Sequence, residues 1–253
     1  MISDVQRASV FKRISAGIFD FIITSTLIVA ITLLLSAILG YDGYKTRLDG
    51  FYAKYEDQFE IKFDMTEEER AAMTDDDRKR YDEAYEALIS DNDAMYTYNM
   101  IISLTLLITS IGILLGILIT EFILPLIFGN GQTLGKKIFG VGLMRTDGVK
   151  VSTVMMFVRA ILGKYTLETM IPVLIVLMLI FNMIGIEGTV VLGGILLLQL
   201  ILICATKNRT LVHDLLAYTV AVDVASQRIF ESPEALLEYK KRIHAEQAER
   251  STY

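Results

Sequence analysis

Two acidic residues stand inside long apolar stretches of the sequence, and they are the first candidates for chemistry. Asp20 is the single charge in residues 14–39, and Glu121 is the single charge in residues 100–128. A charged side chain in the middle of a bilayer costs at least about 2.5–3.5 kcal/mol, so such groups pair with other polar groups or line a wet cavity. The two carboxylates are therefore candidates for binding a cation or exchanging a proton.

Three further charged residues are expected to join these two acids. Arg13 precedes Asp20 by seven residues, which places both on nearly one helix face, about 10 Å apart along the axis. We expect a single polar cluster near the inner membrane boundary, made of Arg13, Asp20, Glu121, Arg159 and Asp214. Two interpretations remain open, namely an ion-pair network that fixes helix packing and a cation or proton site in which an arginine competes as counter-charge.

Other kinds of site are not indicated by the sequence. One cysteine and two histidines provide no zinc or haem ligand pattern, and no nucleophile–base pair is apparent. We therefore expect no enzyme activity, no catalytic residue, no metal and no cofactor. Residues 129–153 are rich in glycine, but five residues separate Gly129 from Gly135 where the phosphate-loop pattern has four. Nucleotide binding is rejected on this ground, and no nucleic-acid partner is expected.

The elements that would position the cluster are membrane-crossing helices. Of the 253 residues 53% are hydrophobic, and they gather in long blocks with the charged residues between them. About 20 residues cross a hydrocarbon core of about 30 Å. Blocks 14–39 and 100–128 are long enough, whereas blocks 170–184 and 189–205 are short and predict a tight helical hairpin or, alternatively, a re-entrant pair. The predicted fold class is an all-α polytopic membrane protein with four transmembrane helices, short interfacial helices and a small cytoplasmic β-hairpin element.

The distribution of charge predicts the orientation of these helices. Residues 129–165 contain six basic residues and one acid, whereas residues 41–97 contain 8 basic and 17 acidic residues, a net charge of −9. An excess of Lys and Arg in short loops marks the cytoplasmic side. Both termini and the 129–165 loop are therefore expected in the cytoplasm, and residues 41–97 outside.

The chain is expected to have four parts. Residues 1–40 form an N-terminal cytoplasmic segment with the first transmembrane helix, and residues 41–97 form an acidic extracytoplasmic helical insert. Residues 98–225 form a membrane core with a cytoplasmic hairpin, and residues 226–253 form a cytoplasmic C-terminal helix. In the insert, Thr66 and Thr74 are typical helix N-caps. A calcium site among its aspartates is an alternative to a solvated, capping role, but the EF-hand spacing is absent.

The cytoplasmic loop predicts a small β element and two interfacial helices. Residues 141–152 alternate around Asp147 and Gly148, which is typical of a hairpin, and residues 218–222 could add a third strand. Apolar residues surround Arg159 and Lys164 in residues 151–167, which predicts a helix lying along the membrane surface. A similar helix is predicted at residues 210–216, with Thr210 as its N-cap.

Two glycines in the second apolar block could support close helix contact. Gly112 and Gly116 form a G-x-x-x-G pattern. The pattern is compatible with a homodimer seam or with ordinary packing inside one chain. The lipid bilayer is the expected partner, and partner proteins cannot be identified from the sequence.

Several of these residues together resemble the RDD family of bacterial and archaeal membrane proteins. The resemblance rests on Arg13, Ala16 and Asp20, on the stretch GQTLGKKIFGVGLMRTDG, on Arg159, and on RTLVHDLLAYTVAV. It covers residues 7–40 and 98–224. The family is named for one arginine and two aspartates, which the resemblance implies to be Arg13, Asp20 and Asp214. It implies a multi-pass protein of the cell (inner) membrane, of largely unknown role, with transport of a ligand or ion suggested.

Two functions are therefore carried forward from the sequence. The first is transport of a small cation or proton through the Asp/Glu/Arg cluster. The alternative is a non-transport membrane scaffold or assembly factor that binds partner proteins, with the cluster purely structural. A water-accessible cavity beside Asp20 and Glu121 would favour transport, and a dry, fully paired cluster would favour the scaffold.

Overall fold

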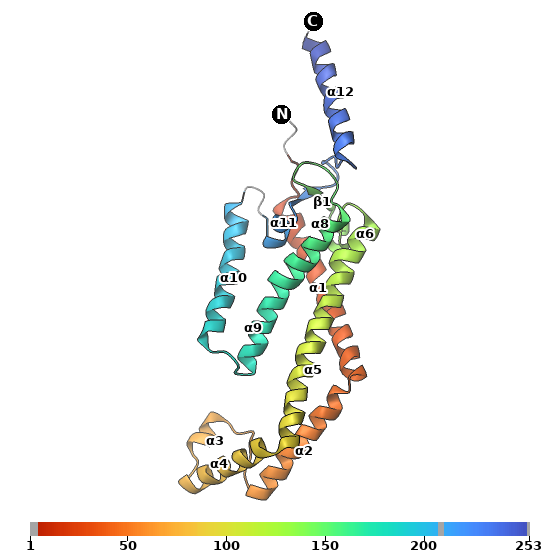
Figure 1. Cartoon of the computed structure of the whole chain (residues 1–253). Helices are drawn as coiled ribbons and strands as arrows, with labels where there is room; N and C mark the ends of the chain where they lie inside the picture. Colours follow the sequence, from red (N-terminus) through yellow and green to blue (C-terminus); the bar gives the residue numbers. More distant parts are fainter. Residues whose placement is uncertain (1–4, 207–209, 252–253) are drawn as a thin grey trace. The chain divides into compact units, whose positions relative to one another are not determined.

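The computed structural model describes residues 5–206 and 210–251, and these form two compact units (Figure 1). The first, here called the core unit, comprises Met1–Ile31 and Gly112–Tyr253. The second, here called the acidic unit, comprises Thr32–Ile111. The division falls within two long helices, so each of those helices contributes to both units.

Within the part of the chain that the structure describes, three helices are long and apolar enough to cross a membrane. They are α1 (Val10–Ile38), the continuous helix Asn92–Phe128 and the continuous helix Thr153–Ile180. A further helix, α10 (Ile186–Ala205), packs against the end of the third through a short connection and has a shorter apolar stretch, Ile186–Leu202 (Figure 1). Length and composition thus support three spans, and the fourth span stays a prediction.

Two of these long helices change from α to π geometry and back. The second consists of α5 (Asn92–Ile117), η1 (Leu118–Ile123) and α6 (Leu124–Phe128). The third consists of α8 (Thr153–Phe157), η2 (Val158–Met170) and α9 (Ile171–Ile180). In a π-helix each N–H bonds to the carbonyl five residues earlier, which widens the turn.

The predicted interfacial helix at residues 151–167 is wrong, because those residues begin the third long helix. Pro172 lacks an N–H, and its ring would clash with a carbonyl of the preceding turn of an α-helix. Here the N–H of Ile171 bonds to the carbonyl of Thr166, five residues back, so the widened turn accommodates the ring. Pro125 follows η1 in the same way, with the N–H of Leu124 bonded to Ile119.

A two-stranded antiparallel sheet lies in the core unit. Strands β1 (Val141–Arg145) and β2 (Thr219–Asp223) pair with Leu143 opposite Ala221. The prediction that residues 141–145 pair mainly with the residues after Gly148 is therefore wrong. The turn at Gly148 exists, but across it Lys150 forms only an isolated bridge with Met144. The chain after the turn does not extend into a longer strand because Ser152 already caps α8.

Two short helices, α7 (Leu134–Ile138) and α11 (Val212–Leu216), and a longer C-terminal helix, α12 (Pro233–Ser251), belong to the core unit as well. The prediction that Thr210 caps α11 is wrong, because the N-cap is Leu211 and the N–H of Thr210 instead bonds to the hydroxyl of Thr206.

The helices of the core unit approach one another closely at Gly116. A methyl group there would collide with the side chain of Ile28 on α1. Nearby, the hydroxyl of Thr24 donates a 3.0 Å hydrogen bond to that of Thr120. Gly116 thus serves contact within one chain, and the homodimer seam remains an untested prediction.

The acidic unit contains helices α2 (Tyr41–Phe59), α3 (Glu67–Ala71) and α4 (Asp75–Ser90). Thr66 and Thr74 form capping boxes as their spacing predicts, with Glu69 and Asp77 as reciprocal partners. Buried Tyr55, Leu88 and Ala94 form its core.

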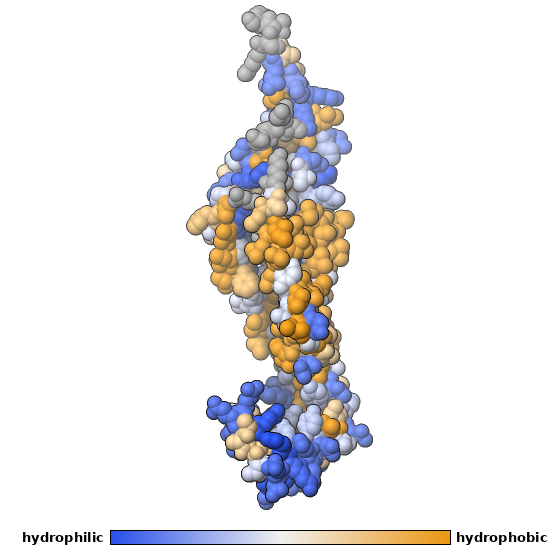
Figure 2. Space-filling view, turned by 90° about the vertical axis from the view of Figure 1, so that its left-hand side faces the viewer, coloured by the Kyte–Doolittle hydropathy of each residue, from blue (hydrophilic) through white to orange (hydrophobic). Residues whose placement is uncertain are grey.

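The two units present different surfaces. Apolar residues gather over the long helices, whereas hydrophilic residues cover α2 to α4 (Figure 2). Phe21 is 71% exposed, and Ile180 and Val190 are each 69% exposed. Soluble proteins rarely expose apolar patches of this extent, so this surface fits contact with lipid.

Candidate functional site

A buried carboxylate on η1 collects three positive charges in the core unit. Glu121 is 3% exposed. Its Oε2 lies 3.3 Å from Nη1 of Arg159 and 3.7 Å from Nζ of Lys136, and its Oε1 forms an ion pair with Lys164. Arg159 and Lys164 both lie on η2, five residues apart, which places them on successive turns of a π-helix. The π geometry of η2 thereby directs both cations to one acid.

Arg159 also joins Glu121 to a second buried acid, Asp214 on α11. Nε of Arg159 donates a 2.9 Å hydrogen bond to Oδ1 of Asp214, and the Thr219 hydroxyl donates to the same oxygen at 2.9 Å. Burial alone would raise the pKa of Asp214, but the neighbouring His213 and Arg159 outweigh it and hold that pKa well below its usual range. Asp214 is therefore a stable anion on α11, bonded to Thr219, the first residue of β2.

His213 and Glu168 lie beyond Asp214. Nδ1 of His213 lies 2.6 Å from Oε2 of Glu168, and the His213 backbone N–H donates a 3.0 Å hydrogen bond to Oε1. Burial lowers the pKa of His213, and nearby Arg159 and Lys164 act in the same direction against the two carboxylates. A methyl group on Gly163 would collide with the Cβ of His213, so this glycine allows α11 to approach η2.

Asp20 on α1 is bound by uncharged donors from the segment leading into α7. The Thr133 hydroxyl donates to Oδ2 of Asp20, and the Gly135 backbone N–H donates a 2.7 Å hydrogen bond to Oδ1. Thr133 is also the N-cap of α7 and accepts from the N–H of Lys136. A methyl group on Gly135 would lie 2.9 Å from the Asp20 carboxylate and collide with the Ala16 carbonyl.

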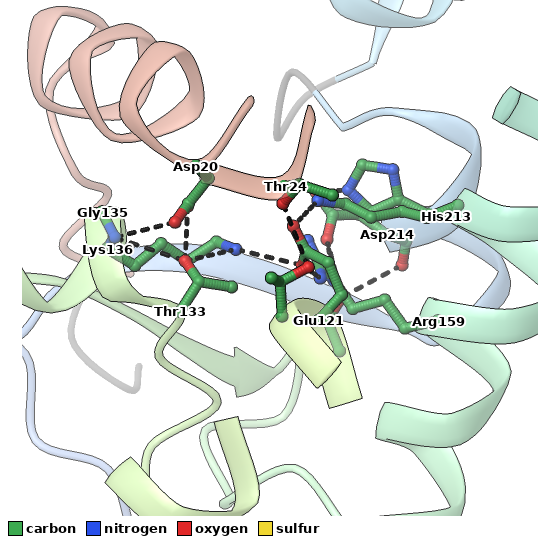
Figure 3. Close-up of polar contacts among 12 residues, drawn as sticks. Asp20, Thr24, Glu121, Thr133, Gly135, Lys136, Arg159, His213 and Asp214 are labelled. Carbon is green, nitrogen blue, oxygen red and sulfur yellow. Dashed lines mark hydrogen bonds and ion pairs between the residues drawn. The ribbon is translucent and has the colours of Figure 1, made fainter. Parts of the chain in front are cut away.

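Lys136 connects the Asp20 side of the site to the Glu121 side (Figure 3). Its Nζ lies 3.3 Å from the Thr133 hydroxyl and 3.7 Å from Glu121. Burial lowers the pKa of Lys136 to about 8, although Glu121 acts in the opposite direction. The structure thus forms one continuous set of contacts, here called the charge network: Asp20, Glu121, Lys136, Arg159, Lys164, Glu168, His213 and Asp214.

The charges of this network nearly cancel. It contains four carboxylates, three lysine or arginine cations and one histidine. Among the residues that the structure describes, the only buried side-chain N or O atom without a hydrogen-bond partner is Oε1 of Gln199, outside the network. The described residues also include no group of three His, Cys, Asp or Glu placed to hold a metal ion. The arrangement therefore joins α1, η1, α7, η2 and α11 by internal pairing.

The structure brings together four of the five residues predicted for the cluster. Asp20, Glu121, Arg159 and Asp214 belong to the charge network. Arg13 lies in the first turn of α1 and is partly exposed.

Sequence reasoning missed half of the network, namely Lys136, Lys164, Glu168 and His213. From the sequence, Lys136 is interpreted only as a cytoplasmic loop charge, and Lys164 only as a loop charge and a residue of the predicted surface helix. The Thr133 N-cap before Gly135 and Lys136 could have located the first of these. Glu168 could have been found as an acid in a helix that continues into an apolar block.

Comparison with known proteins matches the chain to one family. The profile of the RDD family matches residues 7–218, which is most of the chain and includes the whole charge network. No curated protein and no solved structure matches it. Arg13, Asp20 and Asp214, which the resemblance implied as the residues of the family name, all lie inside the matched range. The chain therefore belongs to the RDD family.

Proposed function

We propose that this RDD protein is a non-transport membrane scaffold whose charge network locks its helices together. The observation that carries the proposal is the pairing of Glu121, which already has Lys136, Arg159 and Lys164 around it. A transported cation would have to displace one of these internal cations from a buried carboxylate. Breaking a buried ion pair by removing one partner costs about 3–5 kcal/mol, which makes Glu121 a poor exchange site.

The scaffold would offer two polar surfaces to partner proteins. One is α12, a 19-residue polar helix, and the other is the acidic unit with its capped helices. The charge asymmetry of the loops supports an orientation with both termini in the cytoplasm of a bacterium or archaeon and the acidic segment outside. In this proposal α10 is the fourth transmembrane helix, because 20 residues reach about 30 Å.

The test combines flux and co-purification from native membranes. Proteoliposomes with the full chain should show no proton or sodium flux above empty liposomes. The tagged chain should retain a stoichiometric partner in mild detergent, and loss of α12 or neutralisation of the acidic unit should release it. Flux that requires Glu121, or the absence of any stoichiometric partner, would contradict the scaffold.

A second candidate is proton or cation transport through Asp20. The observation that favours it is that the Asp20 carboxylate is held by uncharged donors, Thr133 and Gly135, rather than enclosed by cations as Glu121 is. Flux in wild-type proteoliposomes that is lost in Asp20→Asn and kept in Glu238→Gln, an exposed control on α12, would establish this candidate. Equal flux in both variants would eliminate it.

A further inference from the structure

The acidic unit contains a half-open cavity with a volume of about 530 Å³. Its walls come from α2, α4, the start of α5 and the connection after α2. Aromatic rings dominate the lining, which includes Tyr52, Phe63, Tyr81, Tyr85 and Tyr98. Small-molecule sites in proteins are cavities of about 300–1,000 Å³ with mostly apolar and aromatic walls and a few placed polar groups.

The aromatic wall is held in place by specific contacts. The Phe63 ring packs edge-on against Tyr52 at 5.6 Å and against Tyr81 at 5.7 Å between centroids. The Phe63 backbone N–H donates a 2.7 Å hydrogen bond to Oε1 of Glu56, which fixes the connection after α2. Burial, together with the neighbouring tyrosines, raises the pKa of Tyr52, so its ring stays neutral.

The charged side chains that line the cavity are acidic. Glu56 and Asp64 contribute carboxylates, and the described residues that line the cavity include no lysine or arginine. The surrounding residues 41–97 carry 17 acidic and 8 basic residues. The cavity therefore combines a negative potential with the electron-rich faces of several rings.

Cations already lie over aromatic rings of the same unit, and one of these rings, that of Tyr81, belongs to the cavity wall. Nζ of Lys54 is 4.5 Å from the centroid of the Tyr55 ring, and the Arg70 guanidinium is 5.3 Å from that of Tyr81. A cation within about 6 Å of an aromatic face is attracted by the ring quadrupole. An ammonium ion with an apolar body can interact favourably with both the aromatic rings and the carboxylates. An anion would be repelled by the carboxylates, and an uncharged molecule would gain only the apolar contacts.

We propose that this cavity binds an organic ammonium ion, with the charged nitrogen over the tyrosine rings beside Asp64 and Glu56. The apolar substituents would contact Leu88, Ile89 and Met95 in the lining. The site belongs to the acidic unit alone and is independent of the charge network, so it does not rest on the scaffold proposal.

The test is equilibrium dialysis of radiolabelled choline against the full-length protein in maltoside detergent at low salt. The uncharged carbon isostere of choline, 3,3-dimethylbutan-1-ol, serves as competitor. We expect saturable choline binding that weakens as ionic strength rises, because exposed charges are screened. The uncharged isostere should compete at least tenfold less well than unlabelled choline.

Paired variants separate the aromatic contribution from the charge contribution. Tyr85 is 51% exposed, so we expect the fold to tolerate its replacement. Tyr85→Leu should weaken binding roughly two- to fivefold while Tyr85→Phe keeps it, because only the latter retains a ring face. Asp64→Asn should weaken binding by a similar factor, and Asp82→Asn, an exposed acid of the same unit outside this cavity, should leave it unchanged.

Four results would overturn the proposal. These are no saturable choline binding, equal competition by the uncharged isostere, wild-type binding by Tyr85→Leu, and equal effects of Asp64→Asn and Asp82→Asn. Helix content measured by circular dichroism verifies that each variant is folded. A variant that has lost helix content is replaced by Glu56→Gln, which removes a lining charge and keeps an oxygen to accept from Phe63.

Discussion

The two units use their charges in opposite ways. In the core unit, acids are buried and paired with residues distant in sequence, such as Glu121 with Arg159 and Asp20 with Gly135, 38 and 115 positions apart. In the acidic unit, the paired charged residues lie at the surface. Asp77 bonds within its own helix end to Thr74, three positions away, whereas Lys54 and Asp91, 37 positions apart, link α2 to the residue after α4. A buried charge needs a partner wherever the fold can bring one, whereas an exposed charge is solvated by water. The difference shows that the core unit depends on buried ion pairs for its tertiary packing, whereas the acidic unit uses its charges at the surface, in helix caps and in solvated pairs.

The largest effect is expected when Arg159, 2% exposed, is removed. Arg159→Ala leaves Asp214 and Glu121 without a shared partner, which should destabilise the core unit by about 3–5 kcal/mol. The measurement is the fraction of protein that stays monodisperse on size-exclusion chromatography after heating in detergent. The control is Arg78→Ala, an exposed arginine on α4, which should change stability by less than about 0.5 kcal/mol. Equal losses would show that burial does not distinguish the units.

Replacing a glycine by alanine should change stability in opposite directions in the two units. Gly135→Ala inserts a methyl group against Asp20 and should destabilise the core unit by about 1–3 kcal/mol. Gly43→Ala on α2 meets open space and should stabilise its helix by up to about 1 kcal/mol. Melting curves followed by circular dichroism measure both. A neutral Gly135→Ala would mean that α7 does not need its close approach to α1.

Removing a helix cap in the acidic unit should affect only the helix that it caps. Thr74→Ala removes the hydroxyl that accepts from the Asp77 N–H, which costs about 1 kcal/mol. Amide hydrogen exchange should accelerate in the first turns of α4, while exchange in η1 and η2 is unchanged. Faster exchange in the π-helices would contradict the independence of the two kinds of charge.

The smallest effect near neutral pH should come from His213. Its pKa is lowered by burial in the folded state, so the unfolded chain binds more protons as pH falls through about 6.5. Stability of the core unit should therefore fall on acidification, and the lowered pKa of Asp214 extends this loss to lower pH. His213→Gln should flatten the dependence between pH 7 and 5 in melting experiments. A wild-type stability that rises on acidification would contradict this sign.

Two acids of the charge network could be located from the sequence because a single chemical rule applies to them. Asp20 and Glu121 could be identified because a lone acid in an apolar block demands a partner. Lys164 and Glu168 could not be placed in the same way, because the sequence predicts a surface helix over 151–167 that is separate from the third span, whereas both residues lie in η2 of the continuous helix. The π geometry of η2 keeps the helix continuous past Pro172, and hydrophobic periodicity does not reveal a π-helix.

The sequence by itself determined the long apolar helices, the capped helices of the acidic segment and the need for buried acids to be paired. These properties depend on residues that are close together in the chain, through hydropathy, N-cap chemistry and charge. Only the tertiary structure decided which cation meets which acid, and that β1 pairs with β2 rather than with the residues after Gly148. Those choices depend on close approaches at Gly135 and Gly163 and on the register of two π-helices, which arise only when distant segments pack.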